Sequence, residues 1–163
     1  MDRTYVPQNG KLTVHKLGLK LWIENVLYSE QIRAQLLCTL LELVCSERAS
    51  EGINIGLFRN ITKMLMDLDP SVYEEVFETR FLQVSAEFYQ LESQKLIDCC
   101  ACGDYLKKAE SYLDEEMDRV SHYLDPRTEN KIADVVAKEM DRKSHAYINT
   151  YGEFRVIKHV LRG

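Results

Sequence analysis

The sequence is poor in the two residues that most often interrupt helices. It has only seven glycines and three prolines among 163 residues, which is few for a chain built from many tight β-turns. Hydrophobic residues make up 45% and charged residues 29%, as in ordinary globular proteins. The composition therefore favours a helical fold, and the length corresponds to a single domain.

Long uncharged runs and clustered basic residues are also missing. No window holds about 18 apolar residues, so we expect no membrane span. The first residues, MDRTYVPQNGKL, do not have the apolar core of a secretory signal. The net charge is −5, and Lys107 and Lys108 are followed at once by acidic residues. Because nucleic-acid binding needs clustered Lys and Arg that neutralise phosphates, we expect neither nucleic acid nor an anionic membrane as a partner.

Cysteine is scarce and unevenly placed. Three of the five cysteines lie close together, at Cys99, Cys100 and Cys102. Structural zinc sites usually pair two ligand clusters, whereas only one is present here, and His122 helps only if the fold brings it near. We therefore expect reduced thiols at a helix break, no metal site, and a cytoplasmic or nuclear location.

Apolar residues recur every three or four positions along most of the chain, which is the period of an amphipathic helix. This period predicts helices over about 12–28, 30–50, 55–68, 72–99, 104–123 and 126–140. Short connections place neighbouring helices antiparallel. The expected fold is all-α, a helical bundle or solenoid of about six antiparallel helices. Residues 141–163 are compatible with a frayed helix, a loop or a strand.

Capping residues indicate where several of these helices begin and end. Ser29 and Asn54 precede the second and third helices as N-caps. Gly52 fits the end of the second helix. Ser71 and Glu74 have the spacing of a capping box at the start of the fourth.

The same period predicts the apolar side of each helix. The second helix has a wide apolar band and is expected to be central, and the fourth is expected to bend near Thr79. Residues expected on the apolar sides are Val14, Leu17, Leu21 and Tyr28 in the first helix; Ile32, Leu36, Leu37, Leu40, Leu41, Val44 and Cys45 in the second; Val76, Phe77, Phe81, Val84, Phe88, Leu91 and Ile97 in the fourth; and Leu106, Ala109, Leu113, Met117, Val120 and Leu124 in the fifth.

No catalytic motif is present in the sequence. The histidines at positions 15, 122, 145 and 159 do not stand in a metalloprotease or nucleophile motif. Acidic runs at 74–75 and 114–118 fall on the expected polar faces of helices, whereas glycosidase carboxylates must face a cleft. Glu115 and Arg119 are spaced to pair along their helix. We expect no enzyme, no cofactor and no catalytic residue.

Tyr5 is the candidate partner-binding residue. Tyrosine and tryptophan anchor many protein interfaces, but most aromatic residues of this chain lie at the helical spacing that predicts burial. Tyr5 precedes the first helix and does not belong to its apolar side. Its position therefore favours a contact with another protein.

Several segments carry a family resemblance. They are FLQVSAEFYQLESQKLID at 81–98, YLKKAE at 105–110, EEMDRV at 115–120 and HYLD at 122–125. Together they resemble, almost word for word, the second helical repeat of the cullin N-terminal stalk. LGLKLWIENV at 17–26, RNITKMLMDL at 59–68 and KIADVVAKEM at 131–140 continue the resemblance.

The resemblance is greatest to the third cullin type, which recruits BTB-domain adaptors, and to plant sequences. It implies a cullin-repeat fold and a non-enzymatic scaffold role in a ubiquitin ligase and ubiquitin-dependent protein breakdown. Residues 1–140 would be the end of the first repeat and most of the second, and 141–163 a divergent tail. Tyr5 falls at an adaptor-contact position of the family.

The resemblance further implies that parts of a whole cullin have no counterpart here. The other adaptor-contact helix, the RING-subunit site and the lysine that receives the ubiquitin-like modifier are expected to be missing. Weak or lost adaptor binding and no RING subunit would follow. The alternative is a degenerate cullin fragment with no independent function.

Overall fold

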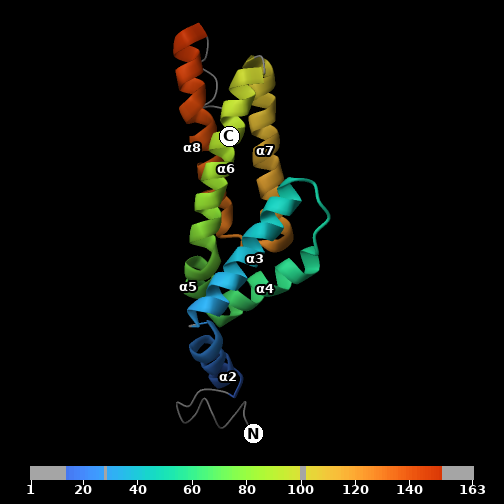
Figure 1. Cartoon of the computed structure of the whole chain (residues 1–163), viewed down its shortest axis with the longest axis vertical. Coiled ribbons are helices and arrows are strands. Elements are labelled where there is room, and N and C mark those ends of the chain that lie inside the picture. Colours follow the sequence, from blue (N-terminus) through green and yellow to red (C-terminus); the bar gives the residue numbers. More distant parts are fainter. Residues whose placement is uncertain (1–13, 28, 100–101, 152–163) are drawn as a thin grey trace. The chain divides into compact units, whose positions relative to one another are not determined.

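A computed structural model describes residues 14–27, 29–99 and 102–151. In this part of the chain every regular element is a helix, which confirms the predicted all-α fold. The elements, with π-helical segments labelled η, are α2 (Val14–Trp22), η1 (Ile23–Leu27), α3 (Glu30–Arg48), α4 (Ile55–Leu68), α5 (Pro70–Tyr73), η2 (Glu74–Glu78), α6 (Thr79–Cys99), α7 (Cys102–Tyr123) and α8 (Thr128–Tyr151) (Figure 1).

The chain divides into two compact units, Met1–Phe77 and Glu78–Gly163. Helices α2 to α5 belong to the first unit and α6 to α8 to the second. Each unit has buried apolar residues of its own.

Helices α3 and α4 of the first unit begin directly after the predicted N-cap residues. Helix α4 has the predicted bounds, and the Asn54 side chain caps it by accepting a hydrogen bond from the Leu57 N–H at 2.9 Å. Ser29 holds the N-cap position of α3, but its side chain makes no capping hydrogen bond. The Ser29 carbonyl instead accepts from the Arg33 N–H at 2.9 Å.

Helix α5 is capped by Asp69 and not by the predicted box of Ser71 and Glu74. The Asp69 carboxylate accepts hydrogen bonds from the Ser71 hydroxyl at 2.7 Å and the Ser71 N–H at 2.8 Å. These two bonds lower the pKa of Asp69. The predicted box is wrong because Pro70 already occupies the first helical position, which makes Asp69 the N-cap.

The first unit has a small core built around aromatic rings. Phe58 of α4 meets Phe77 edge-on with ring centroids 5.8 Å apart, and Tyr73 lies 5.7 Å from Phe77. The edge-on pair of Phe58 and Phe77 adds to the energy gained by burial alone. Leu40, Val44 and Leu65 are also buried in this unit.

Helix α3 is less buried than its sequence predicts. Of its predicted apolar side, only Leu40 and Val44 are fully buried, whereas Ile32 is 47% exposed and Cys45 is exposed. The apolar band of α3 is wider than the surface that other elements cover. Helix periodicity identifies an apolar side but does not show how much of it finds a neighbour.

The π-helical segment η2 lies directly before Thr79, where a bend was predicted. Val76, Phe77 and Phe81 are buried as predicted on both sides of this bend. In α6 the buried positions are Phe81, Ser85, Tyr89, Ser93 and Leu96, while Leu91 is 63% exposed. The predicted burial of Leu91 is wrong because the prediction followed the apolar residues, whereas the buried side beyond Phe81 passes through Ser85 and Ser93.

The second unit has its core where α8 packs against both α6 and α7. One cluster draws residues from all three helices: Tyr89, Leu96, Tyr105, Ala109, Tyr112, Val136 and Met140. The Tyr105 hydroxyl lies 2.9 Å from the Ser93 hydroxyl of α6 and donates to the Met140 carbonyl of α8 at 2.8 Å. Burial raises the pKa of Tyr105, so its hydroxyl stays protonated and links the three helices.

Glu116 is fully buried, although its acidic run was predicted to lie on a solvated face. The Tyr89 hydroxyl and Arg119 Nη1 both donate to its Oε1, the latter at 3.0 Å. Arg119 also lies 3.5 Å from Glu115, which confirms that predicted pair. The prediction for Glu116 is wrong because a hydroxyl and a guanidinium are buried with the carboxylate and offset its loss of hydration.

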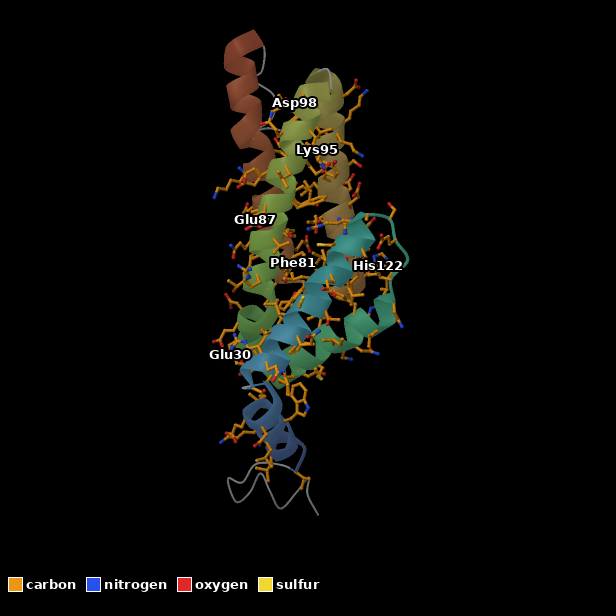
Figure 2. The ribbon with its side chains drawn as sticks, in the orientation of Figure 1. Glu30, Phe81, Glu87, Lys95, Asp98 and His122 are labelled. Atoms are coloured by element: carbon orange, nitrogen blue, oxygen red, sulfur yellow. The ribbon has the colours of Figure 1, made fainter. Side chains whose placement is uncertain are left out.

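A second buried carboxylate, Glu78, is the last residue of η2 and joins this segment to α8. Its two oxygens accept hydrogen bonds from the Thr128 hydroxyl at 2.7 Å and from Lys131 Nζ at 2.5 Å. On the other side of α6, Glu87, Lys95 and Asp98 are exposed (Figure 2). The buried side of α6 is thus polar at Ser85 and Ser93, and the residue before the helix, Glu78, is also buried, which hydrophobic periodicity does not detect.

Helix α3 ends in a left-handed turn at Ser50, two residues before the predicted stop at Gly52. Ser50 has a φ of 61°. Its N–H donates to the Glu47 carbonyl at 2.9 Å, and the Glu51 N–H donates to the Ser46 carbonyl at 2.9 Å. This is the Schellman pattern, in which glycine usually occupies the left-handed position.

Replacing Ser50 by glycine should stabilise the protein. A left-handed conformation costs an L-residue about 1–2 kcal/mol, and the greater freedom of glycine in the unfolded chain offsets part of that gain. We expect Ser50→Gly to raise the free energy of unfolding by about 0.5–1 kcal/mol in urea denaturation. Ala34→Gly, at an exposed position inside α3, is the control and should lower it by about 1 kcal/mol. A lower free energy of unfolding in Ser50→Gly would contradict the left-handed conformation of Ser50.

Removing the Tyr89 hydroxyl should be costly, because it leaves the buried Glu116 with one hydrogen bond fewer. We expect Tyr89→Phe to lower the free energy of unfolding by about 1.5–3 kcal/mol. Tyr112→Phe is the matched control, since its hydroxyl bonds Glu92, which is partly solvated. That control should lose about 0.5–1 kcal/mol. Equal losses in the two variants would show that Glu116 is not buried as described.

Glu92 should contribute to stability only while it is charged. Burial acts to raise the pKa of Glu92, but hydrogen bonds from Lys95 and Tyr112 outweigh it and hold the pKa below 4.5. Its contribution is therefore complete above pH 4.5 and is lost as the pH falls through the lowered value. We expect Glu92→Gln to be less stable than the parent chain at pH 7, with the difference vanishing in acid. A difference independent of pH in urea denaturation would refute this assignment.

Candidate interaction surface

The residues singled out for a partner or a metal fall largely outside the described part of the chain. Tyr5 and Cys100 are not described, nor are the side chains of Cys99 and Cys102. The adaptor contact of Tyr5 and the reduced state of these thiols therefore stay predictions. Among the described residues, no group of three or more His, Cys, Asp or Glu is arranged to hold a metal ion.

His122, the distant candidate ligand, lies exposed near the end of α7 (Figure 2). Its Nδ1 is 2.6 Å from the Asp118 carbonyl and 3.2 Å from the Ser121 hydroxyl. These contacts hold the ring against its own helix, as is common for a surface histidine near a helix end.

Helix α2 exposes an apolar row that we call the α2 stripe, formed by Val14, Leu17 and Leu21. Their exposed fractions are 72%, 47% and 50%. Positions three, four and seven apart lie on one face of a helix. The helical period of the sequence predicts that these residues share one face, and the structure shows that this face is open to solvent.

The α2 stripe is exposed because α2 is held mainly at its C-terminal end. Its main contact among the described elements is with η1, which in turn packs against α3. Leu27 of η1 is buried, and Trp22 and Ile23 are half-buried. Trp22, Ile23 and Leu27 are therefore at least partly covered within the first unit, whereas Val14, Leu17 and Leu21 are exposed.

The other large exposed apolar residues do not form a comparable row. Among the described residues these are Ile32, Ile55, Leu57 and Leu91. Ile55 and Leu57 are two apart, which places them on different faces of α4, and the others stand alone on their helices. Single exposed apolar residues are ordinary, whereas a contiguous row indicates an interaction surface.

The charged side chains described nearest to the α2 stripe in sequence are those of Lys20 and Glu24. Helix α2 contains two lysines and a histidine but no acidic residue. The Lys20 side chain is 60% exposed and lies 3.9 Å from the carboxylate of Glu24 in η1. A surface with an apolar centre and charged edges is the usual form of a protein-binding site.

None of the described helices is both long and apolar enough to cross a membrane.

The comparisons with known proteins identify the family. The model of the cullin alpha solenoid domain matches residues 1–161. Cullin-3A and Cullin-3B of Arabidopsis thaliana are each 55% identical to the chain over 140 residues, and Cullin-3 of Dictyostelium discoideum is 46% identical over 143. These alignments cover 86% of this chain but 19% of each relative.

The match over residues 1–161 includes the helix α8 and extends beyond the 140 residues aligned with the Arabidopsis proteins. The boundary predicted at residue 140 is not tested by either finding and stays a prediction. The extent of the family match and the level of identity agree with the resemblance seen in the sequence, and the chain belongs to the cullin family.

Proposed function

We propose that this chain is a non-enzymatic interaction module of a cullin-based ubiquitin ligase and that it binds a BTB-domain adaptor. The observation that carries the proposal is its 55% identity to Cullin-3A and Cullin-3B. The third cullin type, which the sequence resembles most, recruits such adaptors. The contact we propose includes Tyr5, which falls at an adaptor-contact position of the family.

The environment of the acidic residues supports a role without catalysis. In the described residues three carboxylates are buried, Glu78, Glu116 and Glu139. Glu78 and Glu116 are bonded to hydroxyl and cationic groups inside the second unit. A catalytic carboxylate has to face substrate, whereas these link helices to each other. We also place the protein in the cytoplasm or nucleus, since its resemblance is to ubiquitin-ligase scaffolds.

Binding to a panel of purified BTB domains tests the proposal. We expect at least one domain to bind the intact chain in calorimetry and Tyr5→Ala to weaken that binding at least tenfold, because interface aromatics often dominate affinity. Leu91→Ala, at an exposed position of α6 in the other unit, is the control and should leave the affinity unchanged.

Two outcomes count against the proposal. If no BTB domain binds a chain that unfolds cooperatively, adaptor recruitment is refuted. If the chain has high helix content without a cooperative transition, the alternative of a degenerate fragment with no independent function is favoured. Equal binding by the parent chain and Tyr5→Ala would refute the contact assigned to Tyr5.

A further inference from the structure

We draw no further inference here: the strongest candidate, the exposed apolar face of α2 formed by Val14, Leu17 and Leu21, carries none, because nothing in the described part of the chain shows what covers it.

Discussion

An amphipathic helix has to cover its apolar side, and this constraint explains most of the structure. Burial of one large aliphatic side chain contributes about 1.5–3 kcal/mol, which is a large part of the stability of a small domain. In the second unit α6, α7 and α8 meet this requirement among themselves, with Tyr89, Tyr105 and Met140 at their centre. In the first unit α2 does not meet it, because its apolar row faces solvent.

The second unit also shows how polar groups are accommodated in such a core. Serines at 85 and 93 are completely buried on the side of α6 that also buries Phe81 and Tyr89. Tyrosine hydroxyls then reach across to partners on other helices, as Tyr89 does to Glu116. Because each bond needs both helices in register, these contacts specify one alignment of α6 with α7 where apolar packing alone tolerates several. The hydrogen bonds of Glu78 to Thr128 and Lys131 likewise join separate helical elements of this unit.

Most of the fold could be predicted from the sequence, because apolar period and capping residues are local signals. These signals correctly predicted Asn54 as the N-cap of α4 and both bounds of that helix. The buried side of α6 did not follow from them, since it passes through Ser85 and Ser93, and hydrophobic periodicity does not assign polar residues to a core. The burial of Glu116 was missed for another reason: its partner Tyr89 is distant in sequence. The exposure of the α2 stripe was not predictable either, because a period shows that a face is apolar and not whether another element covers it.

The central claim is that none of the described elements covers the α2 stripe. Residue-resolved amide hydrogen exchange of the intact protein, at a concentration where it is monomeric, tests this claim directly. Amides in a helix held mainly at one end open locally at low free-energy cost, while those in a packed core open only on global unfolding. The account predicts that the amides of α2 exchange much faster than those of α6 between Phe81 and Leu96. Equal protection of α2 and α6 would contradict it, because it would mean that another part of the chain covers the α2 stripe.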